Sequence, residues 1–254
     1  MIIGIRPLLF AWQFLTAVPV SRAHHEPAPD ELAGSMMWYP LVGALLGGAL
    51  AATHWLLLQW MPREVVSVTV IVVLVALTRG LHQDGLADTF DGLAGGRAWA
   101  DRLAIMRDPR IGAIGATGLF LSLILRYAAL QSLPLASLIP ALVCMPAVGR
   151  LTMVAGAYRA PYARAEGGLA APFLKHLSLT HVLGATLSTA GLLVWMFDSA
   201  SALVVLLWTG LLSRGLTAYF CRVFGGVTGD TIGATNEAAE ILFLIAVPWF
   251  GRFA

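Results

Sequence analysis

Long apolar segments restrict the folds open to this chain more than any other feature of its sequence. A helix crosses a bilayer with ~20 mostly apolar residues, whereas an isolated strand in lipid would leave its backbone groups unpaired. We therefore expect an all-α, polytopic integral membrane helical bundle with about seven transmembrane helices. The expected spans cover residues 37–60, 64–79, 111–131, 135–155, 181–197, 201–221 and 238–251.

The composition excludes an ordinary soluble globule of this size. Of the 254 residues, 58% are hydrophobic and only 12% are charged, with a mean hydropathy of +0.79. A soluble domain needs more polar surface than this to cover itself. No tandem repeat or domain linker interrupts the chain, so we expect a single membrane-embedded domain over residues 1–254.

The first twenty residues contain an apolar run bracketed by Pro7 and Pro19. We interpret this run as an interfacial or re-entrant helix rather than a signal peptide, because residues 1–5 before it are themselves apolar and Gln13 and Thr16 interrupt it. Its buried side would carry Leu8, Leu9, Trp12 and Leu15.

The distribution of positive charge predicts how the bundle is oriented. Three long connections, at about 80–110, 156–180 and 222–237, alternate with short ones and therefore lie on one side. Cytoplasmic segments of membrane proteins carry an excess of Arg and Lys. We expect the long loops to face the cytoplasm, because thirteen of the sixteen basic residues fall on that side or at its helix ends. These are Arg6, Arg22, Arg79, Arg97, Arg102, Arg107, Arg110, Arg150, Arg159, Arg164, Lys175, Arg214 and Arg222, whereas Arg63 and Arg252 fall opposite and Arg126 is ambiguous.

Three aspartates in the first long connection are spaced for one face of a helix. Asp84, Asp88 and Asp91 stand at i, i+4 and i+7, with Leu, Ala, Phe and Gly between them. A solvated acidic surface would account for three acids alone. Acids in so apolar a setting beside a membrane span favour a functional site, and hard oxygen ligands suit Mg²⁺ or Mn²⁺.

Basic residues around this aspartate face would complete a site that handles phosphate. A metal ion held by carboxylates, with guanidinium groups nearby, is typical of phosphoryl-transfer sites. Catalysis at such sites depends mostly on positioning and electrostatic stabilisation. Positive-inside topology would explain about half of these arginines without any site. His82 could be a base, a phosphate donor or a plain interfacial residue. The candidates are Arg79, His82, Arg97, Arg102, Arg107 and Arg110.

A second polar cluster precedes the last expected span. It contains Thr228, Asp230, Asn236, Glu237 and Glu240 among several glycines. A turn followed by a helix cap is the simpler interpretation. So many polar groups on the expected cytoplasmic face favour a contribution to substrate binding.

Several segments together resemble one enzyme family. They are residues 14–20, 39–47, 84–92, 105–112 and 228–234, so that the likeness runs from about residue 10 to 240. The family resembled is that of the cobalamin-5′-phosphate synthases, also called adenosylcobinamide-GDP ribazoletransferases. Any one of these motifs alone would be weak, but together they are specific.

The resemblance implies the last assembly step of coenzyme B12 in a bacterial cytoplasmic (inner) membrane. The phosphocobinamide moiety of adenosylcobinamide-GDP would pass to α-ribazole or its 5′-phosphate, with release of GMP and a need for Mg²⁺. The implied partners are these substrates and the lipid bilayer; a homo-oligomer is allowed, and nothing calls for a nucleic acid.

The resemblance also assigns roles to residues of this chain. Asp84, Asp88 and Asp91 would hold the metal, and Asp108 or His82 would be the base. Arg107 and Arg110 would neutralise phosphate oxygens in the reaction. Substrate binding would involve Arg79, Arg102, Thr228, Asp230, Asn236 and Glu237.

Two other functions remain open at this point. Asp88 to Gly92 begins like the D-x-x-D-G motif of CDP-alcohol phosphotransferases, but Gly95 and Gly96 stand where that motif has Ala-Arg. A transporter would carry ionisable residues at mid-membrane, whereas here we expect them, apart from Arg126 and His54, in the cytoplasmic loops.

Overall fold

The computed structural model describes residues 5–20 and 27–249. Within these ranges the secondary structure is helical and contains no strand, apart from one isolated bridge between Tyr162 and Val227. Arg22 and Arg252, which entered the charge count, lie outside the described residues. The α-helices are α1 (Ile5–Leu15), α2 (Pro29–Ser35), α3 (Tyr39–Leu57), α4 (Arg63–Thr78), α5 (Leu81–Ala94), α6 (Trp99–Ile105), α7 (Ala113–Ser132), α8 (Leu135–Ala157), α9 (Ala171–Lys175), α10 (Leu179–Met196), α11 (Ser199–Phe224) and α12 (Gly229–Ala246).

Five helical segments of the described chain are long and apolar enough to cross a membrane: residues 29–57, α7, α8, α10 and α11. A sixth span is reached if α4 and α5, which are bent by 90° relative to each other, count as one crossing. The chain is therefore a multi-pass helical membrane protein, as predicted. The predicted count of seven spans is not confirmed.

The two shortest of the expected spans explain the difference in count. α4 has 16 residues, which at ~1.5 Å per residue is shorter than the ~30 Å hydrocarbon core. The expected last span, 238–251, is part of α12, and residues 250–251 of it lie outside the described chain.

The expectation of a loop over residues 222–237 is wrong. α11 continues to Phe224 and α12 begins at Gly229, with Thr228 as its N-cap, so the connection between them is only residues 225–228. The helix accommodates Glu237 and Glu240 because both carboxylates are paired with arginines inside the bundle. The first long connection, 80–110, likewise contains α5 and α6.

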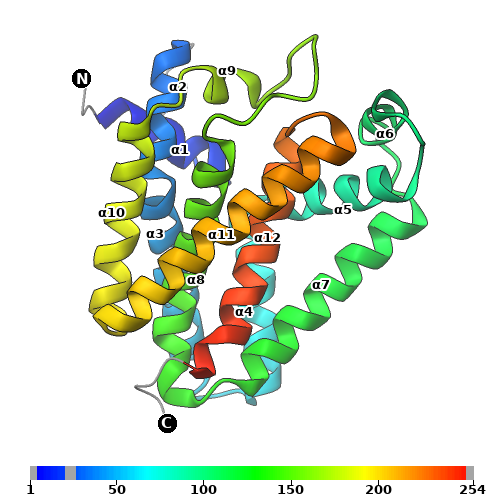
Figure 1. The fold of residues 1–254 in the computed structure, drawn as a ribbon. Coiled ribbons are helices and arrows are strands. Elements are labelled where there is room, and N and C mark those ends of the chain that lie inside the picture. Colours follow the sequence, from blue (N-terminus) through cyan, green and yellow to red (C-terminus); the bar gives the residue numbers. More distant parts are fainter. Residues whose placement is uncertain (1–4, 21–26, 250–254) are drawn as a thin grey trace.

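α8 lies at the centre of the bundle, with helices around it (Figure 1). Most residues of α8 are buried, on every side of the helix. A helix can be buried in this way because its side chains are apolar nearly all round. α3 approaches it closely at Gly43, where an added Cβ would lie 2.5 Å from the carbonyl oxygen of Pro146. Glycine is therefore required at this crossing.

A sharp turn places α5 across one end of the bundle (Figure 1). Arg79 and Gly80 both adopt the left-handed conformation, with φ of 55° and 66°, and the chain leaves α4 almost at a right angle. α5 thus runs across the end of the bundle and does not extend α4 in the same direction. The start of α12 and the end of α11 lie at the same end, as does the segment that leads into α9 (Figure 1).

The N-terminal helix forms as predicted. Leu15 is fully buried in α1, whereas Leu8, Leu9 and Trp12 are half-buried. Phe14 stacks on Tyr39 with ring centroids 6.1 Å apart, so α1 is fixed to the start of α3.

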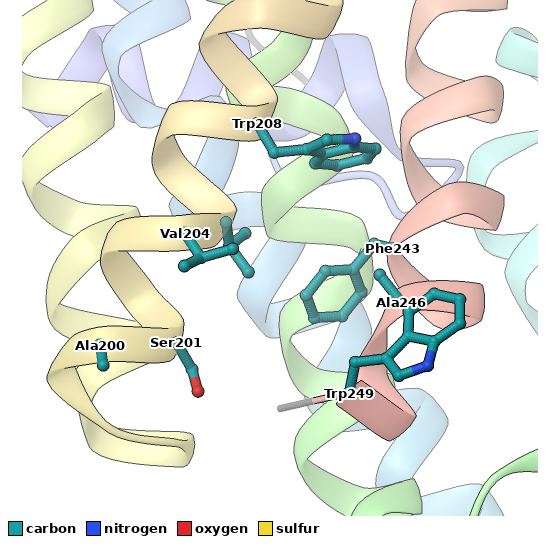
Figure 2. A pocket seen from close by; sticks show the side chains of 8 residues that line it. Ala200, Ser201, Val204, Trp208, Phe243, Ala246 and Trp249 are labelled. Atoms are coloured by element: carbon teal, nitrogen blue, oxygen red, sulfur yellow. The ribbon is translucent and has the colours of Figure 1, made fainter. Parts of the chain in front are cut away.

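An apolar cavity of about 400 Å³ lies between α11 and α12, toward the end remote from α5 (Figure 2). Its walls carry no ionisable side chain, so it offers no groups for acid-base or phosphate chemistry. It is lined by Ala200, Ser201, Val204, Val205, Trp208, Phe243, Ala246 and Trp249.

The arrangement predicts which sites share one side of the membrane. Cysteines introduced at Ala104, in α6, and at Ala165 should label with the same sidedness, because both are exposed at the α5 end of the bundle. A cysteine at Ser199, where α11 begins at the other end, should label from the opposite side. An impermeant maleimide applied to oriented vesicles of a Cys221→Ser protein measures this. Equal labelling of Ser199 and Ala104 from one side would contradict the fold.

Candidate active site

The three aspartates of α5 lie on one face of a helix, as their spacing predicted. The opposite face of α5, including His82, Leu86 and Thr89, is buried in the bundle. Asp84 is exposed and Asp88 and Asp91 are half-buried, so the carboxylates point away from the core. We refer to Asp84, Asp88 and Asp230 below as the acid cluster.

Asp230 joins Asp84 and Asp88 because α12 begins against α5. Gly85 permits this contact, since an added Cβ there would lie 2.8 Å from the carbonyl oxygen of Asp230. Burial raises the pKa of Asp88 to about 7, and the nearby charges of Asp84 and Asp230 contribute to the rise. Burial also raises the pKa of Asp230, although Arg164 opposes that change. The cluster therefore holds more negative charge than the protein itself neutralises.

Asp91 makes different contacts from the other two aspartates of α5. Its carboxylate accepts hydrogen bonds from the backbone N–H groups of Gly112 and Gly115, both at 2.7 Å. These groups form the first turn of α7, so Asp91 caps that helix from a neighbouring one. Asp91 thereby fixes α5 to α7 across the end of the bundle.

The donors of the acid cluster have the chemistry that Mg²⁺ prefers. Mg²⁺ is commonly bound through one or two carboxylates, with water and substrate phosphates completing its shell. Among the described residues, no three His, Cys, Asp or Glu side chains converge closely enough to hold a metal ion by themselves. A site in which Asp88 and one neighbour share the ion with substrate phosphate fits the residues present. A cage of Asp84, Asp88 and Asp91 is not assembled, because Asp91 faces α7.

The sequence-predicted arginines form pairs on the segments around the acid cluster. Arg107 pairs with Glu166, and Arg110 forms a bidentate pair with Asp108, with nitrogen to oxygen distances of 2.9 and 2.7 Å. Hydrogen bonds from Arg110 lower the pKa of Asp108 to about 2, which makes this carboxylate a weak base.

Two further arginines bond to backbone groups. Arg102 donates to the carbonyl oxygens of Gly96 and Val223, and so ties α6 to the end of α11. Arg79 donates to the Gln13 carbonyl at 3.4 Å. In this structure both therefore hold segments of the protein together.

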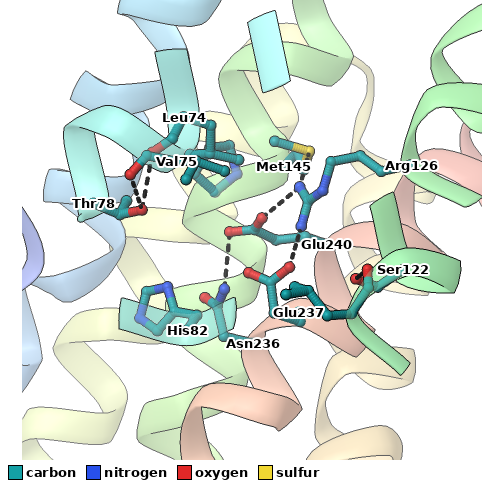
Figure 3. A network of polar contacts seen from close by, with 12 residues as sticks. Leu74, Val75, Thr78, His82, Ser122, Arg126, Met145, Asn236, Glu237 and Glu240 are labelled. Atoms are coloured by element: carbon teal, nitrogen blue, oxygen red, sulfur yellow. Dashed lines mark hydrogen bonds and ion pairs between the residues drawn. The ribbon is translucent and has the colours of Figure 1, made fainter. Parts of the chain in front are cut away.

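The second polar cluster of the sequence divides into two parts. Thr228 caps α12, and Asp230 lies beside Asp84 and Asp88 of α5. Asn236 and Glu237 lie deeper, in a buried network where Arg126 donates to Glu237 at 2.7 Å and to Glu240 at 2.7 Å (Figure 3). The structure thus brings Asp230 to the aspartate face and leaves Asn236 and Glu237 inside the bundle.

His82 lies with this network and not with the acid cluster (Figure 3). Its Nδ1 is 3.4 Å from a guanidinium nitrogen of Arg150, which also pairs with Glu240. The expectation that ionisable residues other than Arg126 and His54 lie in loops is therefore wrong. Arg150, Glu237 and Glu240 are each 1% exposed or less.

Sequence reasoning missed one residue of the site. Arg164, in the segment between α8 and α9, donates to Asp230 at 2.9 Å. It entered only the count of positive charges, because no motif surrounds it. Its carboxylate partner is 66 residues away in sequence, and only the folded chain brings the two together.

These features define a multi-pass helical membrane protein with a carboxylate site, flanked by arginines, at one end of the bundle. The chain matches the family model described as cobalamin-5-phosphate synthase over residues 7–248, and it belongs to that family. Its curated relatives include an adenosylcobinamide-GDP ribazoletransferase of Syntrophobacter fumaroxidans, 42% identical over 86% of this chain and 88% of the relative. Proteins of the same name from Ectopseudomonas mendocina (41% identical, 93% and 96% covered) and Desulforamulus reducens (39% identical, 94% and 95% covered) are also similar. No solved structure matches the chain.

The contacts of Asp91 predict that it differs from Asp88 in a stability measurement. In metal-free protein, Asp91→Asn should lower the thermal midpoint, because losing a half-buried charge-assisted hydrogen bond costs about 1–3 kcal/mol. Asp88→Asn is the matched control and should leave the midpoint unchanged or raise it, since it removes one of several mutually repelling carboxylates. Thermal unfolding in detergent with a chelator present measures both. Equal destabilisation by the two changes would refute the capping role.

Proposed function

We propose that this chain transfers the phosphocobinamide moiety of adenosylcobinamide-GDP to α-ribazole or α-ribazole 5′-phosphate and releases GMP. The product would be adenosylcobalamin or its 5′-phosphate, the last assembly step of coenzyme B12. The family match over residues 7–248 is the observation that carries this proposal. The names of relatives that align over most of this chain support the choice of substrates.

The transfer breaks a phosphoanhydride bond and forms a phosphate ester bond. A ribose hydroxyl of the acceptor attacks the phosphorus that bears the cobinamide arm, and the bond from that phosphorus to the GMP oxygen breaks. The hydroxyl proton must leave to a base as the new bond forms. Such a reaction needs positioning of the pyrophosphate and stabilisation of the charge that develops on its oxygens.

We assign Mg²⁺ binding to Asp88 and Asp230, shared with substrate phosphate, in place of the three aspartates of α5. When bound, Mg²⁺ would neutralise charge on the pyrophosphate oxygens and on the departing GMP. Asp91 would contribute by fixing α5 against α7, because both of its oxygens already accept backbone hydrogen bonds.

Arginines on the connections at the α5 end of the bundle would bind the substrate's phosphates. Arg107 and Arg110 are exposed and can leave their surface carboxylate partners at little cost. For the proton we favour Asp84, the exposed carboxylate of the acid cluster. His82 is buried on the other face of α5, and the pKa of Asp108 is too low for an effective base.

We place the acid cluster on the cytoplasmic side of a bacterial inner membrane, with residues 1–254 as one domain. The arginines at the α5 end of the bundle support this orientation. The buried charges do not favour a transporter, because Arg126, Arg150, Glu237 and Glu240 pair with one another and are almost fully enclosed. The family match leaves no support for a lipid phosphotransferase.

GMP release tests the proposed function. Purified protein with adenosylcobinamide-GDP and Mg²⁺ should release GMP only when α-ribazole or its 5′-phosphate is present, and a chelator should stop it. Asp88→Asn should lower turnover by about a hundredfold, a typical loss when transition-state charge stabilisation is removed. Absence of GMP with both acceptors would refute the proposal, whereas release unaffected by the chelator would refute the metal assignment alone.

A further inference from the structure

The segment of residues 158–170, which we call the strap, is fixed onto the turn that precedes α12. The backbone N–H of Ala163 donates to the Val227 carbonyl at 2.9 Å, and that of Val227 donates to the Pro161 carbonyl at 2.8 Å. Gly226 allows this close approach, because an added Cβ would lie 2.5 Å from the Pro161 oxygen. The strap backbone is thereby held beside the acid cluster.

Arg164 extends from the strap to the acid cluster and uses only part of its guanidinium there. Its Nη2 donates to an Asp230 oxygen at 2.9 Å, and its side chain is 14% exposed. Its Nε is buried and has no hydrogen-bond partner among the described residues. An arginine presents five donors in a planar fork that suits phosphate oxygens, so this side chain has donors left for a ligand.

We propose that Arg164 occupies the place of a divalent cation at Asp230 in the metal-free enzyme and binds a substrate phosphate once the cation is bound. This inference rests on the proposed function and adds a residue to its site. A doubly charged ion beside Asp88 and Asp230 repels a guanidinium a few ångströms away. The released fork then lies next to the pyrophosphate that the ion holds. Only the side chain must move, because the strap stays paired with Val227.

The proposal predicts that removing Arg164 strengthens metal binding. Arg164→Gln should bind Mn²⁺, used as the probe for Mg²⁺ and measured by electron paramagnetic resonance without substrate, about fivefold more tightly than the wild type. The same variant should raise the KM for adenosylcobinamide-GDP by about tenfold or more, because a charge-assisted contact to phosphate is lost. A fall in kcat alone would contradict a binding role.

Two further variants show whether a change in Mn²⁺ affinity comes from competition between Arg164 and the ion for Asp230, or only from the loss of a positive charge or of the fold. Arg214→Gln is the matched control: Arg214 also contacts the strap, donating to the Tyr158 carbonyl at 3.1 Å, and its loss should leave Mn²⁺ affinity unchanged. Arg164→Lys keeps the charge without the planar fork, so it should keep wild-type Mn²⁺ affinity and raise KM.

Unchanged or weaker Mn²⁺ binding by folded Arg164→Gln overturns the inference. If that variant does not fold, an unchanged KM in Arg164→Lys overturns it instead. The Mn²⁺ result does not depend on the proposed function, and failure of that function is distinguished because it appears as a wild-type protein that releases no GMP.

Discussion

The buried ion-pair network between α7, α8 and α12 is the interaction on which the arrangement of the site depends. α12 carries Glu237 and Glu240 into the interior of an apolar bundle, where an unpaired carboxylate would be very costly. Arg126 and Arg150 enter the same space from α7 and α8, so two positive charges meet two negative charges. α12 can therefore be a buried helix and still begin against α5, with Asp230 in its first turn.

The position of the carboxylates at the α5 end of the bundle depends on this buried network. α12 is held from inside and α5 is held by Asp91 at the first turn of α7, so Asp88 and Asp230 face each other from two fixed helices. The resulting concentration of carboxylates is unfavourable without a cation. The protein partly offsets it with Arg164, which the strap supplies from a third direction. Rigid helices thus position the carboxylates, whereas a longer connection supplies the positive charge of Arg164.

The structural features that follow from the periodicity of the sequence could be predicted. The apolar runs predicted a helical membrane bundle, and the spacing of Asp84, Asp88 and Asp91 predicted one face of a helix. The different role of Asp91 could not be predicted, because it depends on where the N-terminus of α7 lies. Glu237 was assigned to substrate because its partner Arg126 is 111 residues away, and nothing local indicates that pair. The available signal for the network was the presence of Arg126, Arg150 and Glu240 inside the expected spans.

A double-mutant cycle between Arg126 and Glu237 tests the central role of the network most directly. Arg126→Met and Glu237→Gln should each lower stability by about 3–5 kcal/mol, because each leaves one buried charge without its counterpart. The double variant retains Arg150 paired with Glu240, so it should be more stable than either single variant in thermal unfolding. If the double variant loses as much stability as the two single variants together, the account is contradicted, because the two charges then do not depend on each other.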